Sequence, residues 1–179
     1  MIDLAKPFDC QIRAMELEDV PRVREIDIAS FSLPWSERSY RFEVQGNPAS
    51  HCYVAELSQG EGQAVIAGMI VVWHILDEAH VGTIAIDQPY RRLGLGRRLL
   101  AEALLDADNH GIQVSYLEVR RSNIAAQALY EQFGFKIAGV RPHYYKDNGE
   151  DAFLMTLAPI QPTLLEQLRQ MPLAVHSGP

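Results

Sequence analysis

A glycine-rich turn at residues 91–96, reading Arg-Arg-Leu-Gly-Leu-Gly, constrains the fold more than any other feature of the chain. The segment before it, residues 79–86, is rich in β-branched residues and is expected to be a strand. The segment after it, residues 94–110, has leucines at helical spacing and ends at Gly111, so it is expected to be a long amphipathic helix. A strand, a tight turn and a helix in this order predict a sheet with the helix packed on one face.

The rest of the chain continues this mixture of strands and helices. Further strands are expected at residues 10–15, 52–57, 65–76, 114–119, 136–145 and 151–157. Further helices are expected at residues 16–31, 37–44 and 163–170, and another runs from an N-cap at Ser122 or Asn123 to residue 133. Ser36 is the expected N-cap of the helix at 37–44. This order predicts an α/β (α+β) fold with one mixed sheet and helices on both faces. The length of 179 residues fits one domain, residues 1–158, followed by a tail, residues 159–179, that contains the last short helix.

Composition and charge exclude several classes of protein. Hydrophobic residues make up 47% of the chain, which is enough for a core and too many for a disordered protein. The net charge of -7 argues against a nucleic-acid binder, although it would suit a basic substrate. The two cysteines, Cys10 and Cys52, cannot form a disulfide framework. Because His51 and Cys52 are neighbours on an expected strand, they face opposite sides, and no metal site is expected.

No segment of the sequence resembles a membrane or export signal. The first ten residues lack an apolar core, and the apolar run at residues 64–75 is too short to span a bilayer. We therefore expect a cytoplasmic protein with no membrane partner.

The turn at residues 91–96 also has the character of an anion site. Backbone N–H groups at a helix N-terminus bind anions, and glycines allow a phosphate to approach closely. Arg91, Arg92, Arg97 and Arg98 add positive charge. A solvated helix start would have the same composition. A Rossmann fingerprint is excluded because Leu99 stands where its third glycine would be, and no Gly-Lys-Ser/Thr of a P-loop occurs.

The remaining pattern, R-x-x-G-x-G, resembles the pyrophosphate signature of the GNAT acetyltransferases. Further matching motifs surround it: Thr-Ile-Ala-Ile-Asp at 83–87, Leu-Glu-Val-Arg-Arg-Ser-Asn at 117–123, Ala-Leu-Tyr-Glu at 128–131, Phe-Gly-Phe at 133–135, Arg-x-x-Tyr-Tyr at 141–145, Glu-Asp-Ala at 150–152, Met155 and Pro-Trp-Ser-Glu at 34–37. Together they are similar to the bacterial ribosomal-protein-alanine acetyltransferase group. The resemblance covers residues 11–157.

The resemblance implies a GNAT fold, with a central, mostly antiparallel sheet of about seven strands, and acetyl-CoA as the cosubstrate. In that family the turn holds the pyrophosphate, and the preceding strand, which carries a bulge, lies beside the pantetheine arm. The implied cofactor-binding residues are Ile84, Ala85, Ile86, Arg91, Arg92, Leu93, Gly94, Leu95, Gly96, Arg97, Asn123 and Tyr130.

Two residues are candidates for proton transfer. Glu118 is a carboxylate in a largely apolar strand, and the family places its general base there; pairing with Arg120, two residues along the same face, is the alternative. Tyr130 lies seven residues after Asn123, two helical turns along the same face. In the family this tyrosine protonates the leaving thiolate. Alone, it would be interpreted as a packed core aromatic.

The substrate side is expected to have two walls. Leu33 and Trp35 would form one, and the Tyr144–Tyr145 hairpin would form the other, as it clamps the peptide backbone in N-terminal acetyltransferases. Neighbouring tyrosines on a strand face opposite sides, so at most one is expected to point into the groove. Core packing is the alternative for Trp35 and strand packing for the tyrosines.

Three functional hypotheses follow. The first is transfer of acetyl from acetyl-CoA to a protein N-terminal amine, directly in a ternary complex, with a ribosomal protein as the implied partner. The second is acetylation of a small amine. The third is a non-catalytic sensor of acyl-CoA, which would need neither Glu118 nor Tyr130. We expect a monomer or a weak homodimer.

Overall fold

The computed structural model describes residues 2–4, 6–60 and 64–173, which form seven strands, five α-helices and two short 3-10 helices. The strands are β1 (Asp9–Ala14), β2 (Ser50–Ser58), β3 (Val65–Ile75), β4 (Glu78–Ile86), β5 (Val114–Arg120), β6 (Lys136–Arg141) and β7 (Ala152–Leu157). The helices are η1 (Leu17–Asp19), α1 (Val20–Ser30), α2 (Glu37–Gln45), η2 (Gln88–Tyr90), α3 (Leu95–Asn109), α4 (Ile124–Gln132) and α5 (Pro162–Gln170).

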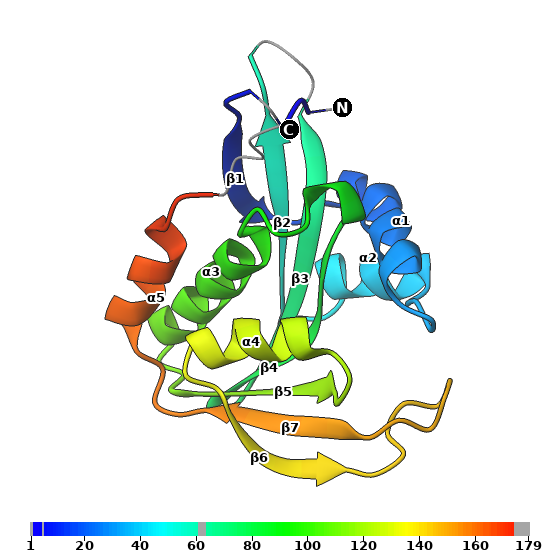
Figure 1. Ribbon diagram of the computed structural model, residues 1–179, viewed down its shortest axis with the longest axis vertical. Coiled ribbons are helices and arrows are strands. Elements are labelled where there is room, and N and C mark those ends of the chain that lie inside the picture. The colour runs from blue at the N-terminus through cyan, green and yellow to red at the C-terminus, as the bar shows by residue number, and fades with distance from the viewer. Residues whose placement is uncertain (1, 5, 61–63, 174–179) are drawn as a thin grey trace.

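The seven strands form one twisted sheet in the order β1-β2-β3-β4-β5-β7-β6 (Figure 1). The β4–β5 pair is parallel, and the other strand pairs in the described part of the chain are antiparallel. The expected mixed, mostly antiparallel sheet of about seven strands is therefore confirmed.

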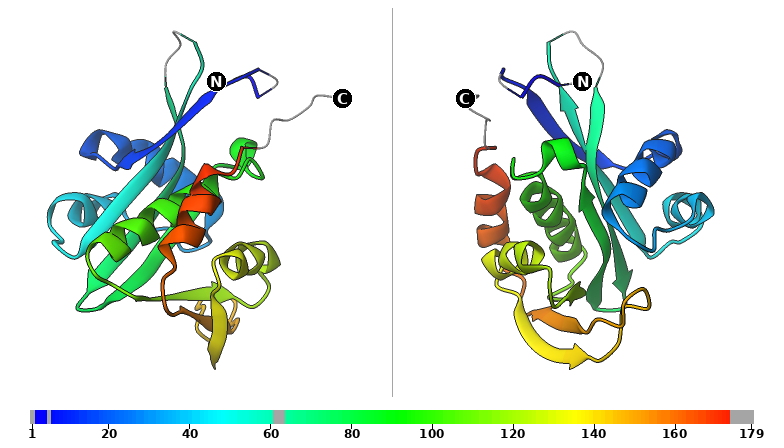
Figure 2. Two further views of the ribbon diagram at one scale, coloured as in Figure 1. Left: turned by 90° about the vertical axis from the view of Figure 1, so that its left-hand side faces the viewer. Right: turned by 45° about the vertical axis from the view of Figure 1, so that its right-hand side comes forward.

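Helices cover both faces of the sheet, as predicted (Figure 2). Helices α1 and α2 lie on one face, where Val23, Ile26 and Tyr40 are buried against strand side chains. Helices α3, α4 and α5 lie on the other, in the larger core. Leu165 and Leu168 of α5 are buried there, so the segment after residue 158 packs on the domain. Residues 174–179 of the predicted tail lie outside the described residues.

Helix ends follow local sequence signals. The Ser36 side chain accepts a hydrogen bond from the Ser39 N–H, and Asn123, rather than Ser122, accepts one from the Ala126 N–H. Asn123 thus caps α4. Each cap satisfies a backbone donor that the first turn of a helix leaves without a partner.

The single helix predicted at residues 16–31 is wrong, because the chain forms η1 and then α1. Pro21 stands in the first turn of α1 and has no N–H to continue a helix from further back. The Asp19 carboxylate accepts a hydrogen bond from the Glu16 N–H at 2.8 Å and so stabilises the short 3-10 turn.

The described part of the chain contains two free thiols, Cys10 and Cys52, and none of its helices has the length and apolar character of a membrane span.

Candidate active site

A cleft opens in the middle of the sheet, where the parallel strands β4 and β5 diverge. The two strands pair only from Glu78 to Val81 of β4 and from Val114 to Leu117 of β5. Beyond these residues the strands separate, and a cavity of about 430 Å³ lies between residues 82–86 and 118–120. Because a strand edge without a neighbour exposes backbone donors and acceptors, this gap presents polar main-chain groups to a ligand.

The N-terminus of α3 closes one side of this cleft. Gly94 caps the helix in the left-handed conformation, with φ of 94°, and Gly96 lines the cavity. Leu93 and Leu95 are buried in the core, so their side chains anchor the turn rather than line the cleft. The first turn of a helix has N–H groups without intrahelical partners, and this end therefore provides an anion site at the cleft.

The arginines of the turn do not all contribute to that site. The Arg91 guanidinium donates to the Ile86 carbonyl at 2.9 Å and lies near Ser30. Arg97 instead reaches α5, where it donates to the carbonyl oxygens of Leu168, Met171 and Pro172 at 3.0–3.1 Å. The resemblance places the backbone of Arg97 at the cofactor, whereas its side chain holds the C-terminal helix, a partner for which the sequence had no signal.

We expect Arg97→Met to destabilise the protein by about 1–3 kcal/mol, because three hydrogen bonds from a charged group are lost at the end of α5. Urea denaturation measures the loss. Arg92→Met is the control, since it removes an exposed arginine from the same turn. Equal stability of the two variants would show that Arg97 does not hold α5.

Glu118 faces the cleft from β5, as predicted, with about a quarter of its side chain exposed. Its Oε1 atom pairs with Arg141 Nη1 of β6 at 3.0 Å. The alternative pairing with Arg120 is not formed, because Arg120 binds Asp147 at 2.7 Å and Glu150 at 3.1 Å. Arg141 thus fixes one carboxylate oxygen of Glu118, and this ion pair does not involve the other oxygen.

Tyr130 lines the cleft from α4 opposite Glu118, and only 5% of its surface is exposed. Burial, reinforced by the neighbouring Tyr145, raises the pKa of Tyr130 well above its ordinary value. The hydroxyl therefore keeps its proton at physiological pH and can act as an acid. Asn123 also lines the cleft, and its side chain caps α4, which confirms the cap expected from the sequence.

Both Tyr144 and Tyr145 line the cleft, so the prediction that at most one of them would do so is wrong. The predicted strand at residues 136–145 ends at Arg141, and His143 adopts a left-handed conformation with φ of 51°. The tyrosines therefore lie in a loop where strand alternation does not apply. Their rings meet edge to face at 5.2 Å, and the Arg120 guanidinium lies 3.8 Å above the Tyr145 ring.

The loop between α1 and α2 forms the opposite wall, with Leu33 exposed and Trp35 half-buried, as predicted. Asp27 of α1, which sequence reasoning missed, holds this loop: its carboxylate accepts a hydrogen bond from the Trp35 N–H at 2.6 Å. Burial raises the pKa of Asp27, although the nearby Tyr40 hydroxyl and the bond from the Trp35 N–H oppose this. Arg24 secures the same loop through the Trp35 carbonyl at 2.7 Å.

The two walls are joined by a polar bridge that sequence reasoning also missed. The Ser32 hydroxyl of one wall hydrogen-bonds the Asp147 carboxylate of the other at 2.5 Å. Arg120 of β5 contacts both residues. The bond from Ser32 and the Arg120 charge lower the pKa of Asp147, so this carboxylate stays ionised at neutral pH. The bridge fixes the distance between the walls at one end of the cleft.

A β-bulge bends β4 next to the cleft. Val71 and Val72 of β3 pair with Thr83 and Val81, which leaves Gly82 as the extra residue. The resemblance implied a bulge at residues 84–86, but those residues pair with β3 in continuous register. The bulge therefore lies where β4 begins to separate from β5, and not within residues 84–86.

We expect Gly82→Ala to destabilise the protein by about 1–3 kcal/mol. A methyl group at Gly82 would lie 2.8 Å from the Trp73 ring, which itself stacks on Trp35 at 5.9 Å. Thermal unfolding measures the effect on stability. The KM measures the effect on the cleft wall. Gly139→Ala is the control, because a methyl group there meets nothing within 4 Å. Equal behaviour of the two variants would contradict this account.

The comparisons with known proteins agree with this geometry. The profile of the acetyltransferase (GNAT) family matches residues 20–135, which is more than half of the chain. The chain therefore belongs to the acetyltransferase (GNAT) family, and the resemblance drawn from its motifs is confirmed.

Two relatives and one solved structure are more specific than the family profile. The chain is 36% identical over 148 residues to the ribosomal protein bS18-alanine N-acetyltransferase of Escherichia coli (strain K12), covering 82% of this chain and 95% of the relative. It is 38% identical over 148 residues to the N-alpha-acetyltransferase RimI of Mycobacterium tuberculosis (strain ATCC 25618 / H37Rv), covering 80% and 89%. The crystal structure of the ribosomal-protein-S18-alanine N-acetyltransferase from Escherichia coli superposes with a TM-score of 0.73 at 35% identity, covering 86% and 95%.

Proposed function

We propose that this protein transfers the acetyl group of acetyl-CoA to the N-terminal α-amino group of a protein, in a ternary complex. The observation that carries the proposal is the convergence of an anion-binding helix start, Glu118 and Tyr130 on one cleft between two aromatic walls. Family membership and the N-terminal acetyltransferases among its relatives support the same reaction.

The cofactor would lie along the open edge of β4. The backbone N–H groups at the start of α3, near Gly94 and Gly96, suit a pyrophosphate, and the open edge of residues 84–86 suits the amide groups of a pantetheine arm. In this arrangement the thioester sulfur would come to the middle of the cleft, between β4, β5 and α4.

Glu118 and Tyr130 would carry the two proton transfers. As the amine nitrogen forms a bond to the thioester carbonyl carbon, Glu118 takes a proton from the amine, directly or through a water. When the carbon–sulfur bond breaks, Tyr130 gives its proton to the thiolate. An α-amine suits a carboxylate base because its pKa, about 7.7–8.0, is far below the value of about 10.4 for lysine.

A peptide N-terminus fits the two walls better than a compact amine does. Leu33 and Trp35 offer apolar contacts on one side, and the Tyr144 and Tyr145 rings lie on the other. A ribosomal protein, which is what the Escherichia coli relative acts on by name, is the natural candidate substrate, and it would imply a cytoplasmic location. Small-amine acetylation is the second candidate, since the cleft is open to solvent beside the tyrosines.

A substrate panel tests the proposal. The protein is incubated with acetyl-CoA and peptides that begin with Ala, Ser-Ala, Met or Gly, alongside internal-lysine peptides and polyamines, while thiol release is followed. We expect turnover on peptides with a free α-amine and little on the same peptides with a blocked N-terminus. Turnover on polyamines alone would favour the small-amine function. Tight acetyl-CoA binding without turnover would favour a sensor.

A further inference from the structure

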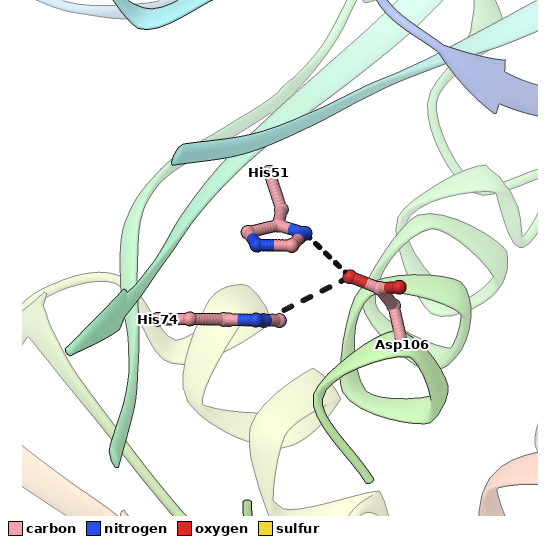
Figure 3. Close-up of side chains that lie close together, drawn as sticks. All are labelled: His51, His74 and Asp106. Atoms are coloured by element: carbon pink, nitrogen blue, oxygen red, sulfur yellow. Dashed lines mark ion pairs between the residues drawn. The ribbon is translucent and has the colours of Figure 1, made fainter. Parts of the chain in front are cut away.

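Two histidines and one carboxylate form a cluster outside the active-site cleft, and a third histidine, His110, packs beside them. His51 stands at the start of β2, His74 near the end of β3 and Asp106 in the last turns of α3. The His51 and His74 rings stack with centroids 3.6 Å apart, and the Asp106 carboxylate faces both of them (Figure 3). Asp106 Oδ2 lies 2.6 Å from His51 Nδ1 and 3.9 Å from His74 Nε2.

The His74 ring in this cluster has no hydrogen-bond partner at either nitrogen among the described residues. The His74 side chain is only 9% exposed. Buried polar atoms are normally paired, so an unpaired imidazole directed at a carboxylate requires an explanation. The unpaired His74 Nε2 lies 3.9 Å from Asp106 Oδ2, which is too far for a hydrogen bond and leaves room for an ion between the two groups.

We propose that His51, His74 and Asp106 bind a divalent transition-metal ion of the Zn²⁺ class. Each residue offers one ligand atom, and these atoms lie within 4.8 Å of one another. Imidazole and carboxylate are the donors that suit Zn²⁺, and a tetrahedral ion with bonds of about 2.0–2.1 Å needs its ligands about 3.3 Å apart. Because the His51 and His74 rings are stacked at an interplanar angle of 22°, one of the two imidazoles must turn so that both nitrogens reach the same ion.

The residues around the three ligands are arranged as supports for such a site. Tyr53 lies near Asp106, and burial together with the Asp106 charge raises the pKa of the Tyr53 hydroxyl, so this group stays a neutral donor beside the carboxylate. His110 packs its ring edge-on against His51 and His74 at 5.2 and 5.3 Å. His110 Nδ1 lies 2.7 Å from the Asp106 carbonyl oxygen, and donation to that oxygen leaves Nε2 with a free lone pair. Outer groups of this kind orient ligands at metal sites.

The proposed ion would be structural and separate from acetyl transfer. Asp106 comes ten residues after Gly96, which places it about 15 Å along α3 from the helix start at the cleft. The ion would join the C-terminal end of α3 to the ends of β2 and β3. The negative end of the helix dipole also favours a cation at this position. No metal site was expected from the sequence, because His51 and its neighbour Cys52 face opposite sides of a strand; the ligands His74 and Asp106 join His51 only through the packing of β2, β3 and α3.

The test uses the full chain with its affinity tag removed, because histidine tags bind the same metals. After treatment with chelator, Zn²⁺ binding is measured by equilibrium dialysis, and Co²⁺ is used to record the visible spectrum of the bound ion. We expect one Zn²⁺ per chain, a tetrahedral Co²⁺ spectrum and a higher Tm with metal. Acetyl transfer should be unchanged by the chelator, so failure of this site and failure of the proposed function are distinguishable.

Two variants and one control locate the ion. Asp106→Asn keeps the side-chain shape, and His51→Asn removes a partly exposed ligand, so both should fold. Each should weaken Zn²⁺ binding by at least about tenfold and abolish the rise in Tm. His80→Asn is the matched control, because His80 pairs with Glu78 at 2.8 Å but belongs to no group of three possible metal ligands in the described part of the chain. Binding that is absent in the parent protein, or that is lost equally in His80→Asn, would overturn the proposal.

Discussion

Replacing Glu118 by glutamine should lower kcat/KM by about 10²- to 10³-fold at about pH 7, and by much less at about pH 10. Glutamine keeps the size of the side chain and can still contact Arg141, which lies 3.0 Å from the native carboxylate. It cannot accept a proton from the amine. At neutral pH most α-amine is protonated, whereas at high pH it is already neutral and needs less help from a base. The pH profile of the variant measures this difference.

The control for Glu118 is Glu56→Gln. Both carboxylates are about one-quarter exposed and pair with an arginine, since Glu56 lies 2.7 Å from Arg13, but Glu56 is outside the cleft. Glu56→Gln should leave kcat/KM unchanged at all pH values. If Glu118→Gln lowered the rate by the same factor at every pH, Glu118 would have a positioning role rather than that of a base.

Replacing Tyr130 by phenylalanine should lower kcat by about 10²-fold while acetyl-CoA binding is retained. The ring that fills the core beside Phe135 remains, and only the hydroxyl is removed. Because burial and Tyr145 raise the pKa of Tyr130, its hydroxyl stays protonated through the assay range. The parent enzyme should therefore show no loss of activity on the alkaline side, up to about pH 10, that depends on Tyr130. Steady-state kinetics and calorimetry with acetyl-CoA measure the two effects.

Tyr90→Phe is the matched control for Tyr130→Phe, because Tyr90 is equally buried, at 4% exposure, and does not line the cleft. We expect it to keep full activity. A Tyr130→Phe variant with normal kcat would exclude the hydroxyl as the acid. A variant that had lost acetyl-CoA binding would indicate that the hydroxyl serves mainly to hold the cofactor.

Much of the fold could be predicted from local signals. Alternation and helical periodicity identified all seven strands and all five α-helices, with errors where a single backbone conformation changed the course of the chain. Pro21 divided the first helix, and the left-handed His143 ended β6 early. The early end of β6 affects the site, because strand alternation does not apply to Tyr144 and Tyr145 and both line the cleft.

The candidate site was predictable where its chemistry depends on neighbours in the chain. Gly96 at the start of α3, Glu118 and Tyr130 line the same cleft in the structure, as the resemblance to the acetyltransferase family implied. The partners of these groups were not predictable. Arg141 rather than Arg120 pairs with Glu118, and Arg97 holds α5 instead of facing the cleft.

The sequence by itself therefore determined the elements, their caps and the glycine-rich helix start, because hydrophobic periodicity and capping act over a few residues. The tertiary structure alone decided which distant side chains meet. Sheet register sets those pairings, and a shift of one residue exchanges the two faces of a strand. The contact of Asp27 with the Trp35 loop and the cluster of His51, His74 and Asp106 are meetings of distant side chains of this kind. Their residues come together only when β2, β3 and α3, or α1 and the loop after it, are packed.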